Sequence, residues 1–172
     1  MSLTLRPADV DMLDAAMEGD EALSRVLGGI AVAEGWAVFT QALPAARRLL
    51  AADGPRWRTR LFLHDDTLVG WGGFKGPPVD GVVELGYSIA PAFRGRGLAT
   101  AATEAMLAEA WADDAVHTVV AHTLAERNAS TRVLEKAGFA HDGEAEEGGE
   151  RVWRWVTARA SAAGGTAAPP RS

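Results

Sequence analysis

The sequence predicts an α/β fold built on a mixed β-sheet, and the order of its elements carries this prediction. Apolar runs at 57–64 and 68–74 flank the turn-forming Asp65-Asp66-Thr67, which predicts an antiparallel hairpin. Further along, a strand, an alanine-rich helix and a second strand follow one another between residues 82 and 123, the order of a βαβ unit. The 172 residues, 48% of them hydrophobic, suffice for one domain with its own core.

The segment before the hairpin contains a predicted strand and two predicted helices. Leu3 and Leu5 alternate with polar residues ahead of Arg6-Pro7, as in a short strand. Asp9 suits a helix start, and the apolar face of that helix would be formed by Val10, Leu13 and Met17. The stretch 44–51 reads as a helix with proline in its first turn.

Two glycine-containing stretches interrupt these patterns. Residues 28–36 are small and glycine-rich, and no regular element is predicted for them. Gly72-Gly73 lies inside the second hairpin strand, where paired glycines indicate a bulge or a close backbone approach by a ligand.

The second half alternates strands and helices. A strand at 82–89 ends before Pro91, and a β-branched strand is predicted at 116–123. The helix at 98–112 would bury a helical stripe made of Leu98, Ala102, Ala105 and Met106.

A short helix and a last strand complete the predicted domain. Asn128 is the expected N-cap of a helix at 128–137, which closes at Gly138 so that Phe139 packs back on Leu134. The acidic run 142–150 is expected to be a solvated turn that could attract a cationic amine, and 151–156 a strand. We expect the domain to span 1–157 and the Ala-, Gly-, Ser- and Pro-rich residues 158–172 to form a disordered tail.

Composition excludes several classes of function. The absence of cysteine rules out disulfides, thiolate metal sites and a cysteine nucleophile, and it suits a cytoplasmic protein. No apolar run approaches the roughly 20 residues that span a bilayer, so we expect no membrane partner. The net charge of −6 has the wrong sign for nucleic-acid binding, and an anionic ligand would need a local basic site. His64, His117 and His141 lack metal-ligand spacing with acidic partners, and no metal is expected.

The loop Arg94-Gly95-Arg96-Gly97-Leu98-Ala99 lies between a predicted strand and a predicted helix. Its glycines leave backbone N–H groups open, the helix adds its dipole, and its arginines add positive charge, so it can cradle a diphosphate. A P-loop is excluded because no Lys-Ser/Thr pair follows, and a dinucleotide fingerprint because Thr100 stands where a third glycine belongs. The remaining alternative is a tight strand–helix turn without a ligand.

Two segments resemble motifs of the GNAT superfamily of acetyl-CoA-dependent N-acetyltransferases. Glu84 to Thr100, ELGYSIAPAFRGRGLAT, is similar to its acetyl-CoA motif, and Asn128 to Phe139, NASTRVLEKAGF, to its second CoA motif. The second motif and Arg6-Pro7 resemble the branch of ribosomal-protein N-terminal (RimJ/RimL-like) acetyltransferases. The resemblance covers roughly residues 3 to 157 and implies a twisted mixed sheet, splayed open for CoA and flanked by helices.

The resemblance also implies where acetyl-CoA, the expected cosubstrate, would bind. The cofactor arm would pair with the backbone of Tyr87, Ser88 and Ile89. Its pyrophosphate would lie on the amides of the loop and first helical turn, Gly95, Arg96, Gly97, Leu98, Ala99 and Thr100, with Arg94 and Asn128 nearby. The sequence departs from the family at two positions. Arg127 stands where many members carry an Asn that contacts the cofactor, and Leu134 stands where many carry a Tyr that acts as the acid.

Each candidate catalytic residue has a structural alternative. Glu84 would be the base, acting through water, or a carboxylate in a salt bridge. Ser130 would protonate the leaving thiolate, or cap its helix. His122 and Glu150 are further candidates for the base. The alternative for His122 is a half-buried strand residue without a catalytic role. Four tryptophans could either line an acceptor cleft or pack in the core, namely Trp36, Trp71, Trp153 and Trp155.

The sequence therefore predicts an enzyme that moves an acetyl group from acetyl-CoA to a primary amine by direct attack. The alternative is a non-catalytic acyl-CoA-binding regulatory module, which the missing tyrosine would suit. The amine acceptor stays open between a protein N-terminus, an antibiotic, a polyamine and an amino acid, and a homodimer is compatible with the sequence.

Overall fold

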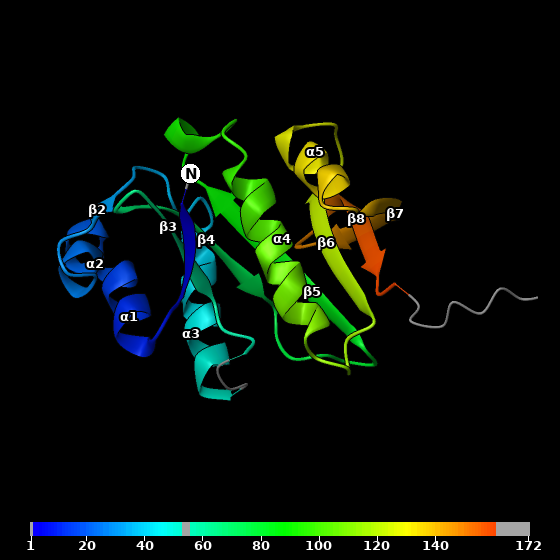
Figure 1. Cartoon of the computed structure of the whole chain (residues 1–172), viewed down its shortest axis with the longest axis horizontal. Coiled ribbons are helices and arrows are strands. Elements are labelled where there is room, and N and C mark those ends of the chain that lie inside the picture. The colour runs from blue at the N-terminus through cyan, green and yellow to red at the C-terminus, as the bar shows by residue number, and fades with distance from the viewer. Residues whose placement is uncertain (1, 53–55, 161–172) are drawn as a thin grey trace, which may run out of the picture.

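The computed structural model of the chain describes residues 2–52 and 56–160, and it shows a mixed sheet with helices on both faces (Figure 1). The predicted fold class is confirmed. The helices are α1 (Val10–Glu18), α2 (Asp20–Val26), α3 (Leu43–Ala52), α4 (Leu98–Trp111) and α5 (Ala129–Lys136), with short 3₁₀ turns η1 (Thr40–Ala42) and η2 (Pro91–Phe93). The strands are β1 (Leu3–Pro7), β2 (Ala31–Val32), β3 (Arg60–His64), β4 (Thr67–Phe74), β5 (Val82–Ile89), β6 (Thr118–Leu124), β7 (Ala140–Glu147) and β8 (Glu150–Ala158).

The sheet has the strand order β1-β3-β4-β5-β6-β8-β7, with the short β2 added beside β4. Strands β5 and β6 are parallel, as a βαβ unit through α4 requires. Their pairing covers only Val82 to Glu84 of β5 opposite Thr118 to Val120 of β6. Beyond Glu84, β5 pairs with β4 and β6 pairs with β8, so the two central strands part and the sheet splays (Figure 1).

The hairpin β3–β4 forms as predicted, although its first strand begins at Arg60 rather than at Trp57. Asp65 and Asp66 take left-handed backbone angles, φ 46° and 58°, which suit a tight two-residue hairpin turn. The bulge expected at Gly72-Gly73 is wrong, because the register shift lies between Phe62 and Leu63. The close approach at Gly72 is by the neighbouring strand: an added Cβ would lie 2.6 Å from the Gly86 carbonyl oxygen.

Two hydrophobic cores cover the two faces of the sheet. The core under α4 and α5 includes Phe62, Leu85, Met106, Leu134 and Trp155, and the core under α1 to α3 includes Leu13, Leu23, Trp36, Leu61 and Trp71. Two predicted helix faces were partly wrong. Helix α1 buries Met12, Leu13 and Ala15 because it packs against both α2 and α3, which leaves Val10 and Met17 exposed. Helix α4 buries Thr103 and Leu107, while Ala105 is exposed.

Helix α5 confirms the predicted signals at both ends. The Asn128 side chain accepts a hydrogen bond from the Thr131 N–H at 3.1 Å, and the Thr131 hydroxyl oxygen accepts one from the Asn128 N–H, which completes a capping box. Gly138 is left-handed with φ 92°, and the Phe139 N–H donates to the Leu134 carbonyl at 2.9 Å. Phe139 and Leu134 lie in the same core.

The acidic run was wrongly expected to be a turn. Most of it forms β7, an edge strand whose partner β8 follows a turn at Gly148-Gly149. Nearly every β7 side chain is exposed, so the sequence lacks the apolar alternation that would reveal a strand. The expected domain boundary at Thr157 falls inside β8, and Arg159 donates hydrogen bonds to the carbonyls of Val116 and Asp113. The rest of the expected tail, 161–172, lies outside the described residues.

None of the helices in the described part of the chain is long and apolar enough to cross a membrane.

The glycines of β4 and β5 give a test of this packing. An added Cβ at Gly70 would lie 2.2 Å from the Ser88 carbonyl oxygen, whereas at Gly86 it would meet nothing within 4 Å. We expect Gly70→Ala to lower the free energy of unfolding by about 1–3 kcal/mol, the cost of forcing atoms into a filled site. Gly86→Ala, the matched control, should leave it unchanged or slightly raised. Chemical denaturation measures both, and equal stabilities would contradict the close approach of β4 and β5.

Candidate active site

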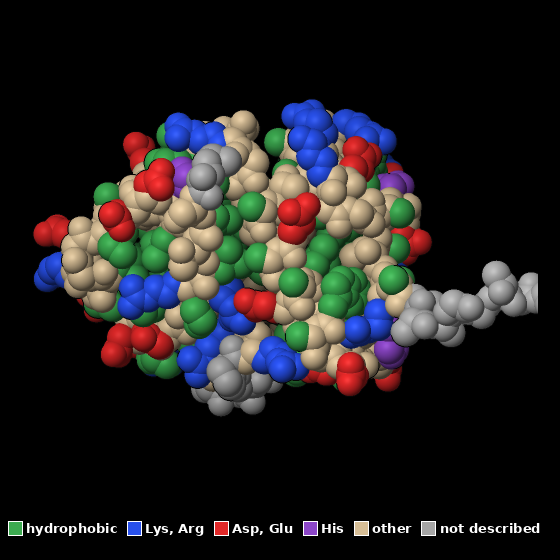
Figure 2. All heavy atoms as spheres, viewed as in Figure 1, with side chains coloured by type: hydrophobic (Ala, Val, Ile, Leu, Met, Phe, Trp, Pro, Cys, Tyr) green, Lys and Arg blue, Asp and Glu red, His purple; other side chains and the backbone are tan. Residues whose placement is uncertain are grey.

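A cavity of about 440 Å³ opens between β5, the loop after it and α5. It brings together Ser130, the predicted acid, and most residues that the sequence predicted to bind the cofactor: Tyr87, Ser88, Ile89, Arg94, Gly95, Gly97, Leu98, Ala99, Thr100 and Asn128. Arg96 is the exception, because its guanidinium lies over the Phe93 ring at 4.9 Å and donates to the Ala92 carbonyl. Arg and Lys side chains gather over η2 and over α5, on either side of a hollow (Figure 2).

The parting of β5 and β6 leaves one side of the β5 backbone open. The Lys75 N–H donates to the Glu84 carbonyl at 2.8 Å, and the Ala90 N–H donates to the Val69 carbonyl at 2.7 Å. Because peptide groups alternate along a strand, Ser88 also turns its backbone toward β4, and Tyr87 and Ile89 turn theirs toward the gap. The prediction that Ser88 offers backbone groups there is corrected: its hydroxyl, too, is engaged, with the Trp36 carbonyl at 3.0 Å.

The loop after β5 has the geometry of an anion site. Gly95 and Gly97 are left-handed, with φ 74° and 77°, and an added Cβ at either would meet nothing within 4 Å. Gly97 is the N-cap of α4 and makes no side-chain cap. The first N–H groups of α4 therefore have no partner within the helix and face the cavity together with the positive end of its dipole.

Helix α5 adds two cations that the sequence reasoning missed. Arg132 and Lys136 line the cavity, and among the described residues neither lies within 4.0 Å of a carboxylate. Their i, i+4 spacing on the helix that follows Asn128 was the available signal. Arg127, which replaces a common family Asn, is instead paired with Glu135.

Tyr87 and Ser130 meet at the inner part of this cavity. The Tyr87 hydroxyl donates to the Ser130 backbone carbonyl at 3.4 Å, a long hydrogen bond. Burial of the phenol, only partly offset by that hydrogen bond, raises the pKa of Tyr87 to about 12. Leu134, at the position where family members often carry a tyrosine, is 1% exposed and belongs to the core.

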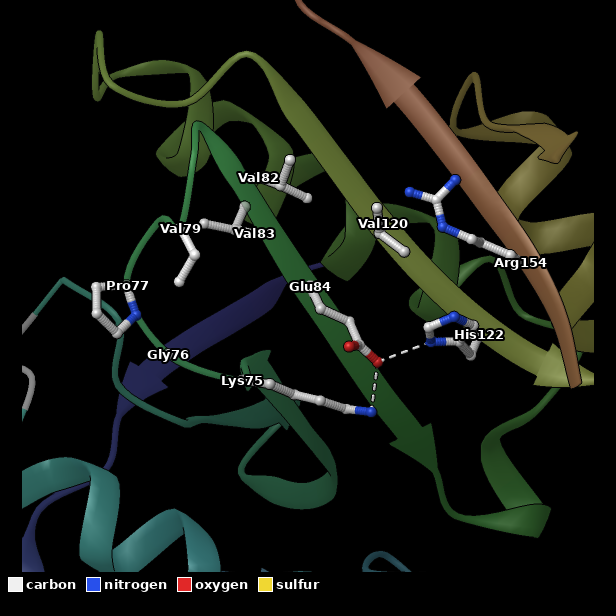
Figure 3. A pocket seen from close by; sticks show the side chains of 10 residues that line it. All are labelled: Lys75, Gly76, Pro77, Val79, Val82, Val83, Glu84, Val120, His122 and Arg154. Carbon is white, nitrogen blue, oxygen red and sulfur yellow. Dashed lines mark hydrogen bonds and ion pairs between the residues drawn. The ribbon is translucent and has the colours of Figure 1, made fainter. Parts of the chain in front are cut away.

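A second cavity, of about 360 Å³, lies on the other face of the sheet beside the point where β5 and β6 part. Val83 and Leu85 point into the core under α4, so Glu84 between them points away from that core. The Glu84 carboxylate lies 2.5 Å from the Lys75 ammonium and 2.9 Å from the His122 Nδ1 (Figure 3). Glu147 of β7 reaches the same Lys75 ammonium at 2.7 Å.

These contacts fix the charge states of the carboxylate and the ammonium. Burial opposes ionisation of Glu84, but hydrogen bonds from Lys75 and His122 outweigh it and hold the pKa of the carboxyl below its usual value. Burial likewise opposes the charge of Lys75, but Glu147 and Glu84 outweigh it, so the pKa of the ammonium is raised. Both groups are therefore charged at neutral pH.

Lys75 and Glu147 were not among the predicted site residues. One signal was available: Lys75 is one of only two lysines in the chain, the other being Lys136 in the first cavity. Their meeting with Glu84 depends on sheet register, which sequence patterns do not reveal. Glu150 lies opposite Glu147 in the hairpin and is exposed.

The remaining candidates belong to other parts of the fold. Trp36, Trp71 and Trp155 are buried in the two cores and Trp153 packs against one of them, which confirms the core alternative. Glu84, His122 and Glu147 are the group in the described chain whose ligand atoms, within 4.8 Å of one another, could hold a metal ion. The Lys75 ammonium between the two carboxylates already supplies a positive charge there.

Comparisons with known proteins agree with this geometry. Residues 2–140 match the family described as acetyltransferase (GNAT) domain. An uncharacterized N-acetyltransferase of Bacillus subtilis (strain 168), YjdG, is 26% identical over 90% of this chain and 95% of its own. The aminoglycoside acetyltransferase AAC(6')-Ib, solved in complex with coenzyme A, has a TM-score of 0.64 at 17% identity, covering 92% of this chain and 95% of its own. RimL, a ribosomal L7/L12 alpha-N-protein acetyltransferase solved with coenzyme A, has a TM-score of 0.66 at 16% identity, covering 92% and 94%.

Tyr87 is the chain's single tyrosine, so an ultraviolet titration reads its ionisation directly. We expect the phenolate to form near pH 12 in the folded protein and near pH 10 after unfolding. Because the folded state holds this proton longer, the corresponding stability is complete below pH 10 and is lost between pH 10 and 12. Tyr87→Phe, the control, should remove the signal, and a folded-state midpoint at pH 10 would show that the phenol is exposed to water.

Proposed function

This chain belongs to the GNAT acetyltransferase family and is an acetyl-CoA-dependent acyltransferase, and we propose that it acetylates a primary amine by direct attack on the thioester. The observation that carries the proposal is the pair of cavities. One is basic and lined by the glycine loop, the other is lined by Glu84 and His122, and the parted strands β5 and β6 lie between them. Each reactant thus has a face of the sheet whose chemistry suits it.

The basic cavity supports the placement of acetyl-CoA. Its pyrophosphate would accept hydrogen bonds from the N–H groups of the loop and first turn of α4, Gly95 to Thr100, with the Arg94 charge beside them. The outward peptide groups of Tyr87 and Ile89 would pair with the cofactor arm as a neighbouring strand does. Arg132 and Lys136 would neutralise further phosphate charge from the α5 side.

The reaction makes three chemical demands on the residues around the parted strands. The amine must lose a proton, and we assign this task to the carboxylate of Glu84 together with the groups it contacts. The oxyanion of the tetrahedral species needs a donor, which the outward Ile89 N–H can supply. The leaving thiolate gains from a proton, for which the hydroxyl of Ser130 on the cavity wall is the proposed donor.

The acceptor side supports an amine as substrate. The solved relatives are named as an aminoglycoside and a ribosomal-protein α-N acetyltransferase, so this fold serves both small-molecule and protein amines. In this chain the carboxylates of Glu84 and Glu147 lie beside the second cavity, where they would attract a protonated amine. We propose a protein N-terminus or a small-molecule primary amine as the acceptor.

Charge at Gly97 tests the cofactor site. Gly97→Asp would place a carboxylate where the pyrophosphate should lie, and we expect it to abolish both acetyl-CoA binding in calorimetry and amine-dependent release of the CoA thiol. Gly97→Asn is the matched control, because the asparagine side chain has nearly the shape of aspartate but no charge. Asparagine also tolerates the left-handed backbone of this position. This variant should keep measurable binding.

Unchanged acetyl-CoA affinity in Gly97→Asp, with the fold retained by circular dichroism, would remove the proposed site. A wild-type protein that binds acetyl-CoA but releases no thiol with any of a panel of α-amines, lysines, polyamines and aminoglycosides would instead contradict amine acetylation.

Substitutions of Glu84 and Ser130 test the proposed proton transfers. Glu84→Gln should lower kcat by about 10²–10⁴-fold, the usual range for acid–base assistance, with acetyl-CoA affinity kept. Ser130→Ala should lower kcat by a smaller factor, because water can protonate the thiolate in its place. Steady-state kinetics at saturating acetyl-CoA measures both, and a fully active Glu84→Gln variant would show that its carboxylate takes no part.

A further inference from the structure

Four side chains from four strands or their ends meet at the second cavity, where the acceptor would bind; three of them line it and Glu147 contacts them from β7. Lys75 follows β4, Glu84 lies on β5, His122 on β6 and Glu147 at the end of β7. Lys75 and Glu84 are direct neighbours across the β4–β5 ladder, so their ion pair is fixed by backbone register as well as by charge. Glu147 reaches the pair from the β7–β8 hairpin and lies 4.0 Å from the His122 Nδ1. The Glu84–His122 and Glu84–Lys75 contacts are drawn in Figure 3.

The charges of this cluster do not cancel. Glu84 and Glu147 contribute two negative charges and Lys75 one positive charge, which leaves one negative charge in excess while His122 is neutral. Arg154 of β8 also faces the cavity, but its guanidinium is paired with Asp142 of β7. One additional proton on His122 would therefore make the cluster neutral.

The contact with Glu84 also decides how His122 is protonated. An ionised carboxylate only accepts hydrogen bonds, so the Nδ1 that lies 2.9 Å from it must carry the proton. The neutral ring then has its free lone pair on Nε2. A carboxylate whose pKa is held below its usual value is a weak proton acceptor, whereas an imidazole is intrinsically the stronger base.

We propose that His122 is the catalytic residue that takes the proton from the attacking amine, while Glu84 and Lys75 are positioning residues that act through it. Glu84 orients the ring, and Lys75 limits the cluster to a single unit of excess negative charge. This inference rests on the proposed function and changes the role that the sequence suggested for Glu84.

The amine nitrogen forms a bond to the thioester carbon and the carbon–sulfur bond breaks, so the thiolate leaves with the electron pair. The proton lost by the amine nitrogen goes to His122 Nε2, and the thiolate takes one from water or from Ser130, whose hydroxyl then regains a proton from water. His122 then returns its proton to solvent through the open side of the cavity.

Chemical rescue separates His122 from Glu84 as the proton acceptor. His122→Ala should lower kcat by about 10²–10⁴-fold with acetyl-CoA affinity kept, and added imidazole should restore a substantial part of the rate. The double variant Glu84→Gln/His122→Ala should gain much less from imidazole, because nothing orients the added ring. A nearly active His122→Ala variant, or one that imidazole does not rescue, would overturn the proposal.

Lys75 provides a second readout that a merely structural role would not move. Lys75→Met leaves two uncompensated carboxylates beside His122, so the ring should keep its proton to higher pH and kcat should need a higher pH to reach its plateau. Lys75→Arg, which keeps the charge, should retain the wild-type pH profile. Identical pH profiles for the Met and Arg variants would contradict the role given to Lys75. A wild-type protein that acetylates no amine would overturn the proposed function itself, and this inference with it.

Discussion

The site depends on one interruption of hydrogen bonding: β5 and β6 pair for three residues and then separate. A paired strand has no backbone donors or acceptors left for a ligand, whereas the second half of β5 is paired on the β4 side only. The interruption also leaves a place in the sheet where no strand pairing separates its two faces, although each face is otherwise covered by its own hydrophobic core. In the proposed function, the open edge in the middle of the sheet would be both the binding surface for the cofactor arm and the place where the two reactants meet.

Keeping such an edge open requires firm support on either side of it. On the β4 side, glycines let β5 approach so closely that a methyl group at Gly70 would collide with its backbone. On the far side, the Trp155 indole N–H donates to the Thr123 hydroxyl at 3.0 Å and holds β8 against β6. The β7–β8 hairpin brings Glu147 to the Lys75–Glu84 pair, so an ion-pair cluster bridges the strands near the point where they part. The strands on either side of the gap are therefore held in place by contacts within the protein itself, and the proposed site would need no ligand to form.

The sequence predicted those parts of the molecule that depend on local signals. The glycine loop between strand and helix, the N-cap at Asn128 and the helix end at Gly138 are set by residues within a few positions of each other, and each was predicted. The parts that were missed depend on contacts between distant segments. Strand β7 has no apolar alternation and exists because β8 pairs with it. The meeting of Lys75 with Glu147 depends on how four strands are aligned, and no motif records that alignment.

The exposed β7 strand has a consequence for how the molecules behave toward each other. An edge strand with unpaired peptide groups is a template on which another chain can add a strand. Strand β7 carries Asp142, Glu144, Glu146 and Glu147 along its length, three of them in ion pairs, and such a row of exposed charged side chains disfavours the addition of a further strand. The same acidic residues that left the strand unrecognisable in the sequence thus protect the protein from edge-to-edge aggregation, and this protection weakens in acid as the carboxylates are neutralised.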